Sequence, residues 1–189
     1  MTCPAAQGFA LFETPIGACG IAWSSRGIVG LQLPEATAER TRARLRRRWT
    51  GATETSPPPD VQRAIEQVLA LLGGEAVDLG DIPLDLEAAP DFHRKVYEVA
   101  RTIAPGQTMT YGEIARKLGV PHESREVGQA LGRNPVAIIV PCHRVLGADG
   151  KMGGFSANGG VATKRRILEI EGASAVGAGP LFAGLQQRG

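Results

Sequence analysis

The sequence predicts an α+β protein with two lobes. We expect a small N-terminal antiparallel sheet lobe with helices, and a mainly helical C-terminal domain containing a helix-turn-helix of the winged-helix type. Short β-rich segments between turn residues fill the chain up to Leu33, and helical periodicities dominate after Pro90. Proline-rich and glycine-rich breaks separate these patterns. We place a scaffolding lobe at residues 1–88, a functional domain at 89–173 and a C-terminal tail at 174–189.

The first lobe opens with a predicted three-stranded meander. Its strands are expected at residues 8–13, 18–23 and 28–33, with turns at Thr-Pro-Ile-Gly and Ser-Ser-Arg-Gly. A helix over 36–49 carries six arginines on several faces, which is more typical of a solvated helix than of a nucleic-acid site. After a triple-proline connector, Asp60 is expected to cap a second helix that ends at Gly73-Gly74. A short strand is predicted over 82–86. No residue of this lobe carries recognisable chemistry.

The second half begins with three predicted helices. Apolar residues at helical spacing from Phe92 to Ile103 indicate the first, which Pro105 stops. Thr110 and Glu113 form a capping box that starts the second helix. A third short helix runs over 124–132. Two short helices with a tight connector are typical of a helix-turn-helix, with a plain helical hairpin as the alternative.

The third helix offers few side chains that read DNA bases. Its small residues Gly128, Ala130 and Gly132 would allow a partner to approach closely, and Arg125 and Arg133 lie at its two ends. A major-groove reader usually presents several Arg, Asn or Gln side chains. The composition therefore favours contact with the DNA backbone or minor groove over sequence readout.

A buried β strand is predicted over residues 137–140, ending at Pro141 and leading into Cys142-His143. One interpretation is a nucleophilic Cys142 with His143 as its base, because a thiol reacts well only after deprotonation. The other is a buried cysteine beside a surface histidine, since cysteine is among the most buried residue types. Pro141 favours the first interpretation, because irregular backbone can bring adjacent side chains to one site. The residues of this segment leave both interpretations open.

The overall composition limits which classes of protein the chain can belong to. The chain has 189 residues, a net charge of +2 and three cysteines with no CxxC spacing, so neither a disulfide framework nor a zinc knuckle is indicated. No apolar segment is long enough to span a membrane and no secretory signal is apparent, so we expect a soluble cytoplasmic protein with no membrane partner. Basic residues outnumber acidic ones between Pro90 and Gly172, which favours an anionic partner for that part.

Three stretches together carry a resemblance to a known family. Residues 141–145 read Pro-Cys-His-Arg-Val, Asn134-Pro135 lies upstream, and residues 111–115 read Tyr-Gly-Glu-Ile-Ala. This pattern resembles the O6-alkylguanine-DNA alkyltransferases, also called methylated-DNA-cysteine methyltransferases. The resemblance runs from Pro90 to Gly172 and is looser in the first ninety residues.

The resemblance implies a single-turnover DNA repair enzyme, a methylated-DNA-[protein]-cysteine S-methyltransferase. Such a protein flips O6-alkylguanine out of duplex DNA and moves the alkyl group irreversibly to its own cysteine, here Cys142. It implies double-stranded DNA containing O6-alkylguanine as the partner, a monomer, no cofactor and no metal. Whether O4-alkylthymine is also a substrate stays open. Two alternatives are a non-catalytic alkyltransferase-like lesion binder, which Cys142 argues against, and a cysteine hydrolase using Cys142 and His143.

The resemblance also implies a role for each catalytic residue. Cys142 would accept the alkyl group, and His143 would act on it through a bridging water while Glu171 orients the imidazole. Asn134 would brace the active-site turn. Tyr111 would press on the target phosphate and donate toward the leaving guanine.

Further residues are implied to contact DNA and the flipped base. Arg125 would fill the gap that the base leaves. The other expected DNA contacts are Tyr111, Gly128, Ala130 and Arg133. The expected pocket residues are Val145, whose carbonyl would hold the guanine with that of Cys142, and Phe155 and Ser156. Phe155 stands where the family often has a tyrosine, so a flat apolar wall is kept without the hydroxyl.

Overall fold

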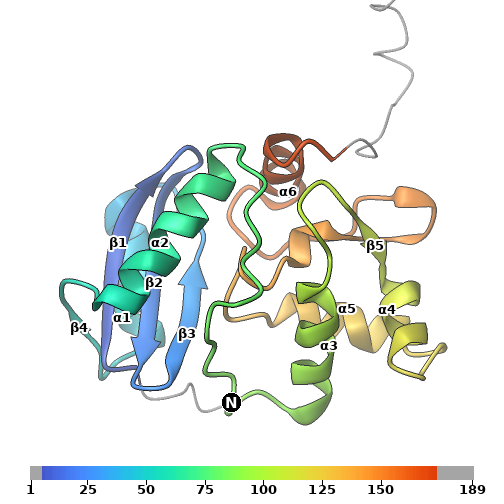
Figure 1. The fold of residues 1–189 in the computed structure, drawn as a ribbon, viewed down its shortest axis with the longest axis horizontal. Coiled ribbons are helices and arrows are strands. Elements are labelled where there is room, and N and C mark those ends of the chain that lie inside the picture. Colours follow the sequence, from blue (N-terminus) through green and yellow to red (C-terminus); the bar gives the residue numbers. More distant parts are fainter. Residues whose placement is uncertain (1–5, 174–189) are drawn as a thin grey trace, which may run out of the picture.

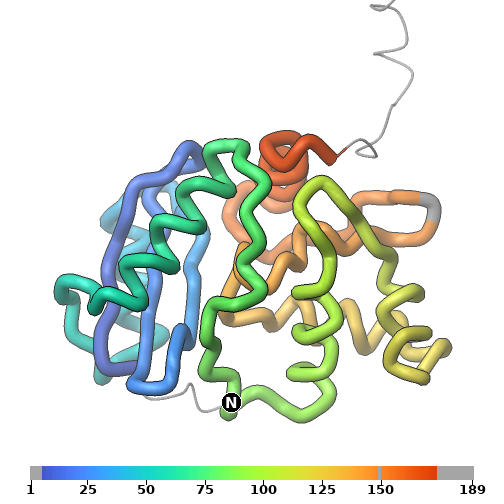
Figure 2. The backbone as a smooth tube through the Cα atoms, in the orientation of Figure 1, coloured from blue at the N-terminus to red at the C-terminus, as the bar shows by residue number. Residues whose placement is uncertain are grey.

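The computed structural model describes residues 6–173 of the chain. The predicted tail over 174–189 lies outside the described residues. Two lobes lie side by side, a sheet with two helices and a mainly helical half, and the segment between α2 and α3 runs along their junction (Figures 1 and 2). The α+β prediction is confirmed. No helix of the described part is long and apolar enough to cross a membrane.

The N-terminal lobe is built on a four-stranded sheet in the order β3-β2-β1-β4. Its strands are β1 (Gly8–Thr14), β2 (Gly17–Ser24), β3 (Gly27–Gln32) and β4 (Thr53–Glu54). β1, β2 and β3 form the predicted antiparallel meander, and the short β4 pairs parallel to β1. β3 is therefore an edge strand of this sheet.

Helices α1 (Ala38–Arg48) and α2 (Pro59–Leu72) cover opposite faces of the sheet (Figure 1). On the α1 face, Leu45 and Trp49 are buried against the strands. Two glycines make this close packing possible. A Cβ on Gly20 would come within 2.2 Å of Leu45, and a Cβ on Gly30 within 2.0 Å of Trp49. Any larger residue at these positions would push α1 away from the sheet.

Two local predictions in this lobe are wrong. Pro58, not Asp60, is the N-cap of α2, and Pro59 occupies its first turn because a proline there gives up no helical hydrogen bond. Asp60 instead lies inside the first turn, where a carboxylate favours the helix dipole. Residues 82–86 form no strand but make a single bridge to β3, between Leu84 and Ile28.

The C-terminal lobe contains helices α3 (Asp91–Arg101), α4 (Tyr111–Lys117), α5 (Ser124–Gly132) and α6 (Gly160–Ile170). Two short parallel strands, β5 (Met109–Thr110) and β6 (Val145–Leu146), complete it. The Thr110 hydroxyl accepts from the Glu113 amide while the Glu113 carboxylate accepts from the Thr110 amide, so the predicted capping box is present. The paired helices α4 and α5 are those predicted for the helix-turn-helix.

The edge of β3 joins the two lobes. The Leu31 amide donates to the Pro135 carbonyl at 3.0 Å, and the Ala137 amide donates to the Leu31 carbonyl at 3.3 Å. Residues 135–137 belong to the turn that precedes Cys142. The sheet of the first lobe is thus hydrogen-bonded directly to the segment that carries the cysteine.

Candidate active site

The segment before Cys142 is a tight turn, so the predicted strand over 137–140 is wrong. The Asn134 side chain holds this turn from inside: its Nδ2 donates to the Val140 carbonyl at 2.8 Å, and its Oδ1 accepts from the Val136 amide at 2.9 Å. Ile138 has a φ of 70°, in the left-handed region that a β-branched residue rarely adopts. The bracing contacts expected of Asn134 are therefore present.

Cys142 and His143 lie on a single turn of 3-10 helix, η1 (Cys142–Arg144), which starts after Pro141. On an extended strand adjacent side chains would point to opposite faces, whereas a helical turn places them about a third of a revolution apart. The 3-10 turn after Pro141 thus keeps the side chains of Cys142 and His143 from pointing to opposite sides of the chain.

His143 is held by a buried carboxylate. Its Nε2 lies 2.9 Å from Glu171 Oε1, and both side chains are fully buried. Arg144 binds the same carboxylate through Nε, 2.8 Å from Oε2, and Nη2, 2.8 Å from Oε1, and its Nη1 also donates to the Ile103 carbonyl. Glu171, at the end of α6, therefore fixes the imidazole and the guanidinium together.

The protonation states follow from these contacts. Burial alone would raise the pKa of Glu171, but the hydrogen bonds from His143 and Arg144 outweigh it and lower that pKa to about 2. Burial lowers the pKa of His143 despite its contact with Glu171. At neutral pH Glu171 is thus ionised and His143 neutral. The proton of neutral His143 then lies on Nε2, facing Glu171, and Nδ1 is left as an acceptor with no hydrogen-bond partner among the described residues.

Cys142 is half-buried, and burial raises the pKa of its thiol. The Asn134 side chain, the positive charge of Lys164 and the backbone amides of Cys142 and His143 act in the opposite direction. Lys164 is fully buried, and its Nζ donates to the Val145 carbonyl at 2.6 Å. The charge of Lys164 thus favours a thiolate at Cys142, while burial lowers the pKa of Lys164 itself and the charge of the thiolate raises it.

Tyr111 lies at the start of α4, close to the glycine-rich loop and α5. A Cβ on Gly153 would come within 2.7 Å of its hydroxyl, and one on Gly128 within 3.7 Å of its ring. Burial raises the pKa of Tyr111, and the negative charge of a Cys142 thiolate raises it further. The tyrosine is thus within electrostatic range of Cys142 and keeps its proton, although it does not line the cavity into which Cys142 opens.

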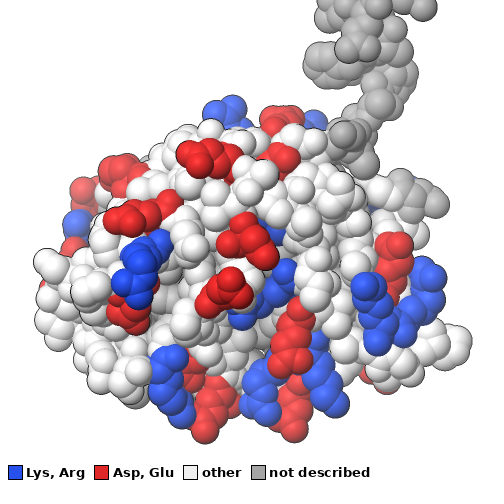
Figure 3. Space-filling view, in the orientation of Figure 1, with Lys and Arg blue, Asp and Glu red and all other residues white. Residues whose placement is uncertain are grey.

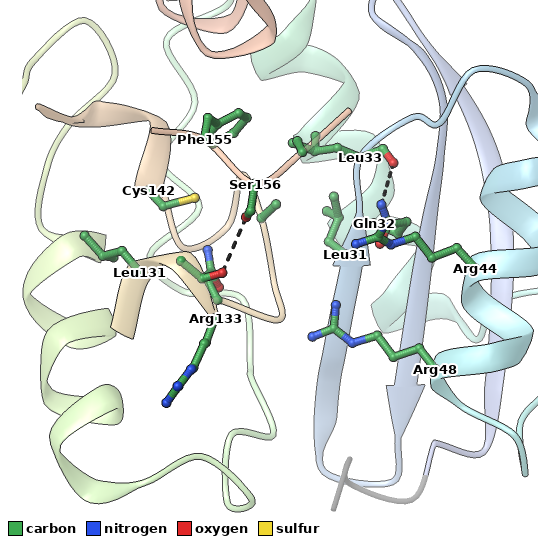
Figure 4. Close-up of a pocket in the computed structure, with 14 residues that line it drawn as sticks. Leu31, Gln32, Leu33, Arg44, Arg48, Leu131, Arg133, Cys142, Phe155 and Ser156 are labelled. Carbon is green, nitrogen blue, oxygen red and sulfur yellow. Dashed lines mark hydrogen bonds between the residues drawn. The ribbon is translucent and has the colours of Figure 1, made fainter. Parts of the chain in front are cut away.

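Cys142 opens into a cavity of about 160 Å³ between the lobes (Figure 4). On the C-terminal side its walls include Leu131, Phe155 and Ser156, and the Ser156 hydroxyl donates to the Gly132 carbonyl at 3.4 Å. The expected pocket positions of Phe155 and Ser156 agree with this geometry. Val145 is fully buried and does not line the cavity, and its carbonyl already accepts a hydrogen bond from Lys164 Nζ. The cavity lining therefore does not include this expected pocket residue.

The opposite side of the cavity belongs to the first lobe. Residues 31–33 of β3 and its extension line it, with Arg44 and Arg48 of α1. The predicted solvated helix is confirmed for Arg40, Arg46 and Arg47, which are exposed, whereas the partly exposed Arg44 and Arg48 also line the cavity. The first lobe does contribute to the site, which its sequence pattern did not indicate.

The residues expected to contact DNA lie on or next to α5. Arg125 and Arg133 are exposed at its two ends, and Gly128 is half-buried beside Tyr111. Ala130 corrects the prediction: it is fully buried, and its carbonyl accepts from the Tyr97 hydroxyl at 2.9 Å, so it belongs to the core. Basic and acidic side chains are intermixed on the face shown in Figure 3.

Sequence reasoning missed Arg144 and Lys164. Lys164 stands at helical spacing from the buried residues Ile167 and Leu168, and a lysine on an apolar helix face is a signal of a buried, partnered charge. In the sequence, Arg144 stands out only as part of the Pro-Cys-His-Arg-Val motif around Cys142. Its role needed the position of Glu171, 27 residues away.

Comparisons with known proteins identify the family of this chain. The family profile described as "6-O-methylguanine DNA methyltransferase, DNA binding domain" matches residues 91–173. The methylated-DNA–protein-cysteine methyltransferase of Mycobacterium tuberculosis (strain H37Rv) is 40% identical over 159 residues, covering 84% of this chain and 88% of the relative. The enzyme of that name from Methanothermobacter thermautotrophicus is 32% identical, with 86% and 84% covered.

Solved structures give the same result. The crystal structure of Mycobacterium tuberculosis OGT in complex with DNA aligns with a TM-score of 0.72 at 37% identity, covering 88% of this chain and 93% of that one. The O6-methylguanine-DNA methyltransferase from Pyrococcus kodakaraensis aligns with a TM-score of 0.65 at 28% identity, with 87% and 99% covered. The profile match, the identities over most of both chains and the shared fold show that this chain belongs to the 6-O-methylguanine DNA methyltransferase family.

Proposed function

We propose that this protein repairs duplex DNA by flipping out O6-alkylguanine and transferring the alkyl group irreversibly to Cys142. Membership of the family makes it a DNA repair methyltransferase whose acceptor is a cysteine. The observation that carries the residue assignment is the arrangement around η1: Cys142 opens into a cavity, and the neighbouring His143 is held neutral with Nδ1 as an acceptor.

The proposed reaction is an in-line displacement at the alkyl carbon. The thiol proton passes through a bridging water to His143 Nδ1, and Glu171 stabilises the imidazolium that results. The thiolate then attacks the carbon, the Sγ–C bond forms, and the C–O6 bond breaks with its electron pair going to the guanine. Tyr111, which burial keeps protonated, donates a hydrogen bond to the leaving base. Because the thioether product is stable, each molecule acts once.

Lys164 supports the proposed thiolate electrostatically from a fully buried position. Its ammonium is held in place by the hydrogen bond that it donates to the Val145 carbonyl. A fixed charge of this kind needs no reorganisation during the reaction, so it stabilises the anionic sulfur at little cost. We therefore add Lys164 to the residues that tune the nucleophile, and Arg144 to those that position His143, through their shared partner Glu171.

On the DNA side, the proposal uses α4 and α5. Arg125, exposed at the start of α5, would enter the space that the flipped base leaves, and Tyr111 would contact the target phosphate. Arg133 would contact the phosphates of the DNA backbone, and the small residue Gly128 would allow that backbone to approach α5 closely. We also propose that residues 89–173 hold the DNA-binding and acceptor functions, while residues 1–88 support the active-site turn through β3 and complete the cavity wall.

The test is the intact mass of the protein after incubation with a duplex that carries one O6-methylguanine. We expect the addition of one methyl group, mapped to Cys142, and no further product with excess DNA. Cys142→Ala is expected to retain binding to the modified duplex and to lose transfer. An unmodified protein with a reduced Cys142 would refute the proposal, and repeated turnover would instead support a cysteine hydrolase.

A further inference from the structure

The cavity in front of Cys142 has a strongly asymmetric lining. On the side of the sulfur its walls carry Leu131 and Phe155 together with the uncharged polar groups of Asn134 and Ser156. The far wall carries Arg44 and Arg48 from α1 (Figure 4). Arg133 adds a third guanidinium at its edge. None of the described residues that line the cavity is acidic. The nucleophile thus faces a cavity whose distant end is positively charged.

The two arginines of α1 differ in how far their charges are neutralised. Arg44 Nη1 lies 2.9 Å from Glu35 Oε1, so much of its charge is already paired. Arg48 is stacked on the Trp49 ring, 4.9 Å from its centroid, and takes part in no ion pair within residues 6–173. The stacking fixes the guanidinium without neutralising it. Of these two arginines, Arg48 therefore keeps more of its charge to receive an anion inside the cavity, and the side chain of Arg133 points away from Cys142 (Figure 4).

Resting on the proposed function, the position of the alkyl group follows from the reaction. The group is bonded to Cys142 at the end of the transfer, so any part of it beyond the first carbon must extend into the space that Cys142 shares with its neighbours. That space is the cavity, which ends at α1. We propose that the cavity accepts O6-alkyl groups ending in an anion, such as carboxymethyl, and that Arg48, assisted by Arg44, binds the terminal carboxylate.

The charge balance of the reaction explains why such residues would matter. A thiolate that attacks the CH2 carbon of a carboxymethyl group approaches a second negative charge, and this repulsion opposes bond formation. The Sγ–CH2 bond forms, the CH2–O6 bond breaks, and the electron pair leaves with the guanine, so the carboxylate keeps its charge throughout. A guanidinium that already contacts the carboxylate offsets the repulsion in the transition state. The product is S-carboxymethyl-Cys142.

An anion in this cavity has a second source, a phosphate of the DNA backbone. Both ligands would be recognised by the same guanidinium chemistry. They differ in what they predict for substrates, because a phosphate is present whatever the alkyl group is. Loss of a phosphate contact would slow the repair of every O6-alkylguanine equally, whereas loss of a carboxylate contact would slow only the charged adduct.

The experiment compares two adducts of nearly equal size in the same duplex, O6-carboxymethylguanine and its neutral amide analogue, O6-carbamoylmethylguanine. Single-turnover transfer rates are measured for both with each protein variant, and the result is their ratio, in which any general effect on folding or DNA binding cancels. We expect Arg48→Gln to lower the carboxymethyl-to-carbamoylmethyl ratio by about fivefold, the upper range for an ion pair open to solvent. Arg48→Lys keeps the charge and should largely restore the ratio.

Arg47→Gln is the matched control, since it removes an equal charge from the exposed face of the same helix, outside the cavity. Its ratio should equal that of the wild type. The wild-type ratio should also fall as salt is raised, because ions screen the contact. A fall of less than threefold with Arg48→Gln, or a wild-type ratio that does not respond to salt, overturns the proposal.

Failure of this inference is separable from failure of the proposed function. Each protein is also given a duplex with O6-methylguanine, which has no charge for Arg48 to bind. Methyl transfer to Cys142 together with an unchanged ratio would leave the repair function intact and remove the anionic subsite. Absence of methyl transfer to the wild-type protein would instead refute the function itself.

Discussion

Replacing Asn134 by alanine would test how the active-site turn is held. The side chain spans the turn, accepting from the Val136 amide at 2.9 Å and donating to the Val140 carbonyl at 2.8 Å. Both valines are fully buried, so water cannot replace these contacts. The turn also contains Ile138 at a φ of 70°, a conformation that costs about 1 kcal/mol or more for such a residue.

The two lost hydrogen bonds are not equivalent. The Val140 carbonyl keeps a second donor, the Cys142 amide at 2.8 Å. Loss of the hydrogen bond from Asn134 to this carbonyl should therefore cost about 1 kcal/mol. The Val136 amide would have no other partner among the described residues, and an orphaned buried donor costs about 1–3 kcal/mol. Asn134→Ala should therefore lower the free energy of unfolding by about 2–4 kcal/mol.

Urea denaturation of the two proteins measures this difference, with Asn158→Ala, at an exposed asparagine, as the control. Because the Asn134 contact lowers the pKa of Cys142, we also expect the variant to react more slowly with iodoacetamide near neutral pH. A loss of less than about 1 kcal/mol would refute the brace as the main support of the turn.

Three further predictions concern the same region. The pKa values of His143 and Glu171 are both lowered in the folded protein, so the unfolded state binds more protons. Stability, measured by urea titrations, should fall as pH drops below ~6.5 and again from ~4.3 toward 2. Glu171→Gln should reduce the second fall, to which Asp85 and Glu113 also contribute because their pKa values are lowered too. Lys164→Met should shift the alkylation profile of Cys142 to higher pH, because it removes a buried cation that lowers the pKa of the thiol; an unshifted profile would show that the lysine is purely structural. Thr110→Ala should cost about 1 kcal/mol in thermal or urea unfolding by removing the capping box, and no loss would mean that Glu113 alone caps α4.

Local sequence determined much of this fold because its signals depend on near neighbours. The meander up to Leu33, the helix predicted from Phe92 onward and the Thr110–Glu113 capping box follow from periodicity and turn chemistry, and all are present in the structure, the helix as α3 (Asp91–Arg101). The family and its acceptor cysteine also followed from short motifs whose order and spacing are readable along the chain. Errors arose where two local signals competed, as at Pro59 and Asp60.

Only the tertiary structure decided the rest, because it depends on groups distant in sequence. Residues 137–140 have the composition of a strand, yet the two hydrogen bonds of Asn134 fold them into a turn that no periodicity indicates. The pairing of His143 and Arg144 with Glu171 requires α6 to return to η1, and Lys164 gains its role in the same way. The sequence showed arginines on a first-lobe helix and a cysteine in the second lobe. That Arg48 and Cys142 line one cavity is decided by the packing of the two lobes, which composition and spacing do not encode.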